Sequence, residues 1–190
     1  MRVLQIIFLL FPFYTLAQTD SIVGSSPLDK MAMQAGSFIN IRSDTLGSTN
    51  DLNIGILTAT DLNSGKKQRS VCFTAANSSY TFGFTVTNNQ IDIEDLSFFI
   101  NALEKMKQVV DSRALAAFQN YQYISSNLTV LSLENRLNNF NKWDLVIYKR
   151  YKYLNAVVPG SLLSIKEKNI EGLLNILKQY SKLLGVDLYK

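Results

Sequence analysis

The sequence predicts an α+β fold class, with antiparallel sheets and two long helices packed on sheet. Residues 80–87 alternate apolar with polar side chains, which is typical of a half-buried strand. Directly afterwards, between Ile93 and Val110, the apolar spacing changes to that of an amphipathic helix. A looser version of the same order closes the chain, from Trp143 to Leu184. These observations predict that strands precede a helix in each half of the chain.

Each half is expected to contribute four short strands. In the first half the strands are expected at 38–47, 52–60, 68–75 and 80–87, and the last of them ends at the turn Asn88-Asn89-Gln90. In the second half they are expected at 118–123, 127–134, 143–148 and 151–158. Clusters of Asn, Ser, Asp and Gly separate the strands, and such short connections indicate antiparallel meanders.

The two helices carry recognisable end signals. Asp92 is expected to be the N-cap of the first helix, since its carboxylate can accept bonds from free backbone N–H groups. Ser164 and Glu167 have the spacing of a capping box for the second helix. Gly185 is expected to end that helix, because glycine tolerates the left-handed conformation found there.

The apolar stripes of the two helices match each other. Adding 74 to Leu96 and Leu103 gives Ile170 and Leu177, which hold the same places in the second stripe. The expected caps do not align under this shift, so the match is one of plan rather than of sequence. The pattern is consistent with an internal β-β-β-β-α duplication, with halves at about 37–110 and 111–190.

The N-terminus has the pattern of a secretory signal peptide. A positive start at Arg2 precedes an apolar run, and Thr15-Leu16-Ala17 places small residues before a cut at Gln18. A membrane anchor is the alternative, but the run is shorter than the roughly 20 residues that a span needs. We therefore expect a signal peptide at 1–17, a flexible arm at 18–36 and a single α+β domain at 37–190. Such a protein would be exported, to the periplasm or outside the cell.

Composition removes several kinds of chemistry. The 190-residue chain contains no histidine, so it lacks the commonest general base and metal ligand. No glycine-rich phosphate-binding motif occurs. Cys72 is the single cysteine and lies in an apolar run, which favours a buried, inert thiol. We expect a protein that is not an enzyme, with no catalytic residues, no metal site and no cofactor.

A basic and aromatic stretch between 142 and 153 is the strongest candidate for ligand binding. Lysine and arginine can hold phosphates while aromatic rings stack on bases. The alternative is a strand pair whose aromatic side chains fill the core and whose basic side chains are solvated. The candidate residues are Lys142, Trp143, Tyr148, Lys149, Arg150, Tyr151, Lys152 and Tyr153.

Two resemblances add to these expectations. The ending Thr15-Leu16-Ala17-Gln18 and helix starts such as Ile93-Glu94-Asp95-Leu96 resemble small exported proteins of Bacteroidota-type bacteria. That resemblance covers most of the chain and implies export without a particular activity. The expected β4-α-β4-α order is similar to the Whirly and PUR-repeat group of single-strand nucleic-acid binders. The Lys-Gly-Lys-Ala-Ala-Leu stretch of the Whirly family is absent, so that resemblance transfers no functional residue.

The sequence thus favours an exported, non-enzymatic protein that binds an unknown protein or envelope component, or serves as its structural partner. The alternative function is binding of nucleic acid or another polyanion through residues 142–153. The net charge of +4 is small for a strong nucleic-acid binder, and a signal peptide would remove the protein from most nucleic acid.

Overall fold

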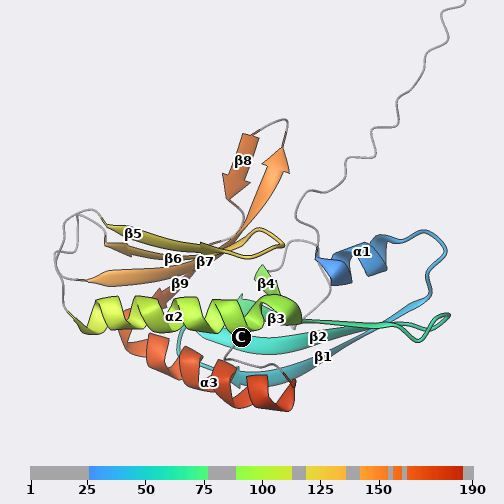
Figure 1. Cartoon of the computed structure of the whole chain (residues 1–190), viewed down its shortest axis with the longest axis horizontal. Coiled ribbons are helices and arrows are strands. Elements are labelled where there is room, and N and C mark those ends of the chain that lie inside the picture. Colours follow the sequence, from blue (N-terminus) through green and yellow to red (C-terminus); the bar gives the residue numbers. More distant parts are fainter. Residues whose placement is uncertain are drawn as a thin grey trace, which may run out of the picture.

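The computed structural model describes residues 26–76, 89–112, 119–135, 142–153, 156–159 and 162–185. It confirms the predicted α+β class, with antiparallel sheets and two long helices (Figure 1). The first sheet has the order β1 (Ile39–Ser48), β2 (Leu52–Asp61), β3 (Lys67–Ala75) and β4 (Asn89–Asp92). The second contains β5 (Asn120–Ile124), β6 (Thr129–Asn135), β7 (Trp143–Tyr153), β8 (Ala156–Pro159) and β9 (Leu163–Lys166). The helices are α1 (Pro27–Met33), α2 (Leu96–Asp111) and α3 (Ile170–Leu183), with short 3₁₀ turns η1 (Ile93–Asp95) and η2 (Glu167–Asn169).

The long strand β7 organises the second sheet. Its first part pairs with β9, from Asp144 to Ile147, and its last part pairs with β8, from Arg150 to Tyr153. β8 and β9 therefore share the place of a fourth strand beside β7. Each half of the chain then has four strand positions followed by a 3₁₀ turn and a long helix.

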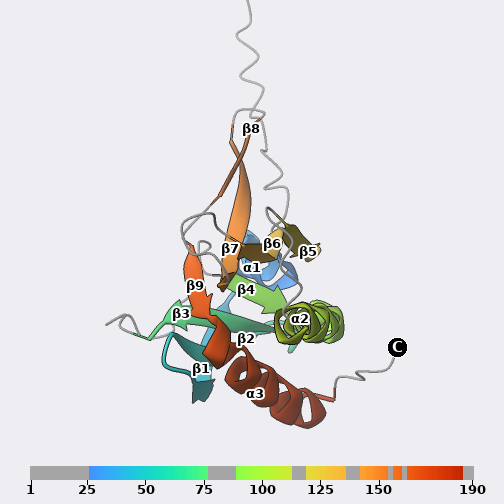
Figure 2. The same cartoon turned by 90° about the vertical axis from the view of Figure 1, so that its left-hand side faces the viewer.

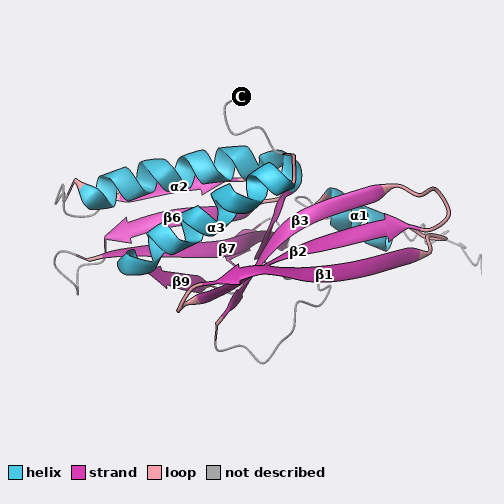
Figure 3. Ribbon diagram, turned by 90° about the horizontal axis from the view of Figure 1, so that it is seen from below, coloured by secondary structure: helices cyan, strands magenta, loops and turns pink. Residues whose placement is uncertain are grey.

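The two sheets and both long helices lie against one another (Figures 2 and 3). One large core joins them. The alternation of each strand places one row of apolar side chains inward, and the helix stripes meet those rows. Phe99 of α2 illustrates the arrangement. Its ring stacks on Phe73 of the first sheet at 5.6 Å and meets Tyr123 of the second sheet edge-on at 6.1 Å. Neither sheet has a separate core of its own facing these helices.

The two halves share strand register as well as element order. Adding 74 to each residue of the pair Ser70–Asp92 gives Asp144–Lys166, and the same shift turns all four β3–β4 pairs into the four β7–β9 pairs. It also turns the start of η1 into that of η2, and the start of α2 into that of α3. The helix starts therefore do align, contrary to the prediction from the caps. The repeat extends to local geometry that the sequence does not reveal.

Several predicted boundaries were wrong. Asn89 and Gln90, expected in a turn, lie in β4 and pair with β3. Ser164 lies in β9, so it forms no capping box with Glu167, and α3 begins only after η2. The third and fourth strands expected at 143–148 and 151–158 are instead the single strand β7 and the short β8. Residues 80–87 lie outside the described residues. The predicted stop at Gly185 is confirmed by its φ of +71°.

Part of the expected flexible arm is a docked helix. α1 begins with a reciprocal capping box, in which the Asp29 N–H donates to Ser26 Oγ and the Ser26 N–H donates to Asp29 Oδ2. Leu28 and Met31 pack on the outer face of the first sheet, against Leu57, Ala59 and Cys72. The apolar face of α1 therefore fixes residues 27–33 on the domain, because undocking would expose it to water.

Candidate binding site

The predicted basic and aromatic residues do not form one surface. Lys142 is exposed at the start of β7, whereas Trp143 beside it is buried in the core. Tyr148 and Arg150 share the outer face of the second sheet, and the Arg150 guanidinium lies 6.0 Å from the Tyr148 ring centre. Arg150 also donates to Gln122 Oε1 of β5 at 3.1 Å. The rings of Trp143 and Tyr148 are therefore both engaged in contacts within the protein, Trp143 in the core and Tyr148 with Arg150.

Lys149 has a structural environment rather than a ligand-binding one. Its side chain is only 3% exposed, and its Nζ lies 3.1 Å from Asp29 Oδ2, a carboxylate that is fully buried in α1. Gln90 Nε2 donates to the other oxygen of Asp29 at 2.9 Å. A buried charge of this kind requires its partner, so Lys149 connects β7 to α1. Tyr151, Lys152 and Tyr153 belong to β7, and their side chains lie outside the described part of the structure.

The edge strand β5 offers a more favourable surface for binding. Its inner edge pairs with β6 without interruption from Asn120 to Ile124, and no described strand pairs with its outer edge. The strand Asn-Tyr-Gln-Tyr-Ile contains neither a charged residue nor a proline. Unpaired backbone groups on such an edge are a ready template for another strand. Most proteins block such an edge with charge, proline or a bulge.

A hollow of about 680 Å³ lies between β5 and α2. Phe98 is its most unusual lining residue, since it lies on a helix yet is 54% exposed. Among the described residues that line the hollow, Lys105 alone has a charged side chain. These residues are Phe98, Asn101, Ala102, Lys105, Met106, Val109 and residues 120–123. An apolar hollow beside an unpaired strand edge can accept both the backbone and the side chains of an extended segment.

The tyrosines of β5 are fixed from the inside. The Tyr123 ring meets Phe99 edge-on, and burial together with the negative charge of Asp95 raises the pKa of Tyr123 to about 12. Tyr121 lies 6.1 Å from the Trp143 ring, and its hydroxyl donates to Gln119 Oε1 at 2.6 Å. These contacts hold the strand in place, so its outer edge is presented in a defined position.

The equivalent edge in the first sheet is closed. β1 has a bulge between Thr45 and Gly47, and it carries the exposed ion pair Arg42–Asp44. Ile176 of α3 packs against Gly47 so closely that a Cβ added to Gly47 would lie 3.2 Å from Ile176 Cδ1. Under the 74-residue shift, Ile176 corresponds to Ala102 of α2. The smaller side chain at that position leaves the hollow beside β5 open.

Sequence reasoning missed this site, although one signal was present. Phe98 is apolar but does not belong to the stripe of Leu96, Phe99, Ile100 and Leu103 that faces the core. An aromatic residue off the stripe of an amphipathic helix indicates a second contact surface. The second signal, an uncharged strand, becomes meaningful only once β5 is known to be an edge.

No chemistry of a reactive centre is evident in the described residues. Cys72 is fully buried as predicted, and burial raises the pKa of its thiol to about 12. Within the described ranges, acidic and cysteine side chains do not gather in a group that could hold a metal ion. In the same ranges, no helix is both long and apolar enough to cross a membrane.

No protein-family model matches the chain, and no curated protein matches it.

Proposed function

We propose that this protein is an exported, non-enzymatic binding protein that accepts an extended polypeptide segment from another protein at the β5 edge. The unpaired, uncharged edge of β5 beside the apolar hollow carries the proposal. A partner strand would bond to the backbone of β5 and extend the second sheet. Export is supported by the signal-like residues 1–17, and the lack of histidine supports a role without catalysis.

The hollow defines the chemistry of the partner. Side chains alternate across a strand, so every second residue of the added strand would face α2. Those residues would meet Phe98, Ala102 and Val109 and should therefore be apolar. Lys105 is the charged residue of the lining, so an acidic residue near it would find a complementary charge. We infer a segment that alternates apolar and polar residues and carries at least one acid.

The comparison of α2 with α3 suggests a substitution that should close the site. Ala102→Ile gives α2 the side chain that α3 uses to cover β1, and it should fill the hollow without disturbing the core. Phe98→Ala removes the exposed ring instead. Phe38→Ala is a matched control, because Phe38 is also exposed, at 66%, but lies directly before β1 and outside the hollow.

The experiment is a selection of displayed random linear peptides against the purified protein. Enriched peptides should show apolar alternation with an acid, and they should bind the Phe38→Ala variant as they bind the native protein. Ala102→Ile and Phe98→Ala should each weaken binding by at least about tenfold, the loss expected when an apolar anchor no longer has its pocket. Equal binding to Ala102→Ile, or selection without enrichment, would refute the proposal. Sedimentation of the unliganded protein distinguishes a second copy as occupant, since self-pairing would make dimers that Ala102→Ile abolishes.

A further inference from the structure

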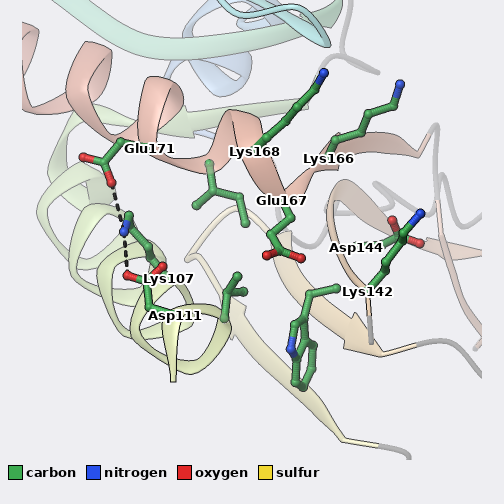
Figure 4. A pocket seen from close by; sticks show the side chains of 11 residues that line it. Lys107, Asp111, Lys142, Asp144, Lys166, Glu167, Lys168 and Glu171 are labelled. Atoms are coloured by element: carbon green, nitrogen blue, oxygen red, sulfur yellow. Dashed lines mark hydrogen bonds and ion pairs between the residues drawn. The ribbon is translucent and has the colours of Figure 1, made fainter. Parts of the chain in front are cut away.

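A second hollow, of about 560 Å³, lies where α2 ends, β7 begins and η2 leads into α3 (Figure 4). Trp143, Val110 and Ile170 provide its apolar lining. Its rim is charged, and Lys142, Lys166 and Lys168 are exposed there. A hollow of this volume accommodates a small organic molecule.

The charges on the rim are unevenly distributed. On one side Lys107 is neutralised, since its Nζ lies 2.6 Å from Asp111 and 3.0 Å from Glu171. The other three lysines lie across the hollow from these ion pairs (Figure 4), and none of them has an ion pair among the described residues.

Two carboxylates share the lysine side of the rim. Glu167 extends between the two groups of charges, and Asp144 is opposite Lys166 in the β7–β9 pairing. The lining as a whole is neutral, with four lysines and four carboxylates, but its charges are separated. The lysine side has three lysines against two carboxylates, and the ion-pair side has one lysine against two carboxylates. An anionic group would therefore find its most favourable place beside the lysines.

The first half shows that the fold does not require these lysines. Under the 74-residue shift, Lys166 and Lys168 correspond to Asp92 and Glu94, so the same junction of strand and helix is acidic there. Trp143 corresponds to Arg69, whose guanidinium donates to the Leu184 carbonyl at 3.3 Å. One backbone plan thus supports an acidic junction in one half and a basic junction with an open hollow in the other. The fold itself therefore does not require basic side chains at this junction.

We propose that this hollow binds a small organic anion with an apolar or aromatic body. Lys142, Lys166 and Lys168 would hold its carboxylate or phosphate at the rim after their exposed side chains turn inward, since the amine ends of Lys166 and Lys168 point away from Trp143 in Figure 4. The body would lie over the largely buried lining of Val110, Trp143 and Ile170. Charge-assisted hydrogen bonds from three ammonium groups supply the selectivity for an anion. The site is independent of the β5 edge and shares no lining residue with it.

Trp143 makes the test direct, because it is the only tryptophan in the chain. Phenyl phosphate and benzoate are the anionic probes, and benzyl alcohol and benzylammonium are their neutral and cationic counterparts. Inorganic phosphate tests whether the apolar body is needed. Titrations are followed by tryptophan fluorescence and, independently, by calorimetry, at low salt and again at high salt, where exposed charges are screened.

At least one of the two anionic aromatic probes should bind saturably and more tightly than benzyl alcohol. Its affinity should fall as the salt concentration rises. A preference for phenyl phosphate or benzoate identifies the anionic group. The double variant Lys166→Ala/Lys168→Ala should weaken binding by at least about tenfold, as expected for lost charge-assisted bonds. Lys66→Ala/Lys67→Ala, at the exposed β2–β3 hairpin, is the matched control and should change nothing. Equal binding of benzylammonium, unchanged binding in the Lys166/Lys168 variant, or no saturation by either method would overturn the proposal.

Discussion

The edge strands β1 and β5 occupy equivalent places in the two halves but end their sheets in different ways. β1 has a bulge between Thr45 and Gly47, and the absence of a side chain on Gly47 leaves room for Ile176 of α3. Phe73 of β3 and Ile147 of β7 correspond under the 74-residue shift, and they pair with Ile54 and Leu131. Across the next ladder Ile54 pairs with Gly47 and Leu131 pairs with Tyr123, so Tyr123 of β5 holds the place of Gly47. The large side chain is on the helix in the first half and on the strand in the second.

This difference in where the large side chain lies determines whether the sheet edge is covered. A helix side chain that covers the strand, as Ile176 does, closes the edge and adds packing. A strand side chain beside a small helix residue, as with Tyr123 and Ala102, leaves backbone and apolar surface available. Phe98 strengthens the contrast, because its counterpart on α3 is Gly172. The first half thus closes its sheet edge by packing, whereas the second leaves a strand edge and apolar surface uncovered among the described residues.

The largest expected effect concerns the ion pair that joins α1 to the second sheet. Lys149→Met leaves the Asp29 carboxylate buried without its cation, and should reduce the free energy of unfolding by about 3–5 kcal/mol in urea titrations. Lys149→Met combined with Asp29→Leu removes both charges and should recover part of this loss. A single-variant loss below about 1 kcal/mol would show that the ion pair does not hold α1.

The next effect concerns the closed edge. Gly47→Val would force branched methyl groups into Ile176, whose nearest atoms would lie only 3.2–3.3 Å from the new Cβ. We expect a loss of about 1–3 kcal/mol, the usual cost of overpacking. Ala102→Ile should cost less than about 0.5 kcal/mol, because its hollow is open. Equal costs for the two variants in thermal unfolding would mean that both edges are packed alike.

A smaller effect distinguishes the acidic junction from the basic one. Burial raises the pKa of Asp92 to about 6, and only its hydrogen bond from Ser70 opposes this. The folded protein thus binds this proton more tightly than the unfolded chain, so the contribution of Asp92 to stability declines as pH rises from about 4 to 7. Asp92→Asn should add about 1–2 kcal/mol at pH 8 and nothing at pH 4.

The control for this pH prediction is the exposed counterpart of Asp92. Lys166→Gln should leave the stability profile between pH 4 and pH 8 unchanged. If Asp92→Asn gave the same change at both pH values, the ionisation of Asp92 would not be its cause.

The smallest effect concerns Gly172. A Cβ at this position would meet only Thr49 Cγ2 at 3.6 Å, an ordinary contact. Gly172→Ala should therefore raise the free energy of unfolding by about 0.5–1 kcal/mol, because alanine restricts the unfolded chain and favours the helix. A lower melting temperature in calorimetry would show that the helix needs a bare backbone next to Thr49.

Periodicity was sufficient to predict the strands β1 to β3, the two long helices and the repeated plan. These elements have strong apolar patterns, which depend only on neighbouring residues. The strand β4 has no such pattern. Its Gln90 is buried because it donates to Ser26 and Asp29, which lie 64 and 61 residues earlier. A local pattern of polar residues therefore indicated a turn where distant partners stabilise a strand.

The candidate sites were less predictable for the same reason. Lys149 belongs to a basic run, and its burial depends on a carboxylate 120 residues away. Lys142 and Trp143 are neighbours in the sequence, but Lys166 and Lys168 join them at the rim of the second hollow only through the pairing of β7 with β9. The hollow beside β5 depends on a side chain that is too small to fill it. Sequence patterns show which residues are present and not which spaces remain between them.

The helix α3 follows the second sheet in the chain but packs on β1 of the first sheet, and this has a consequence for folding during synthesis. α3, the last described element of the chain, covers β1, the first described strand, through Ile176 and Gly47. A nascent chain that ends before residue 170 lacks this cover and has no complete core. Contacts between residues so far apart slow folding, because loop closure must precede them. We therefore expect the protein to remain unfolded on the ribosome and to reach its native state in one cooperative step after its C-terminal helix has emerged.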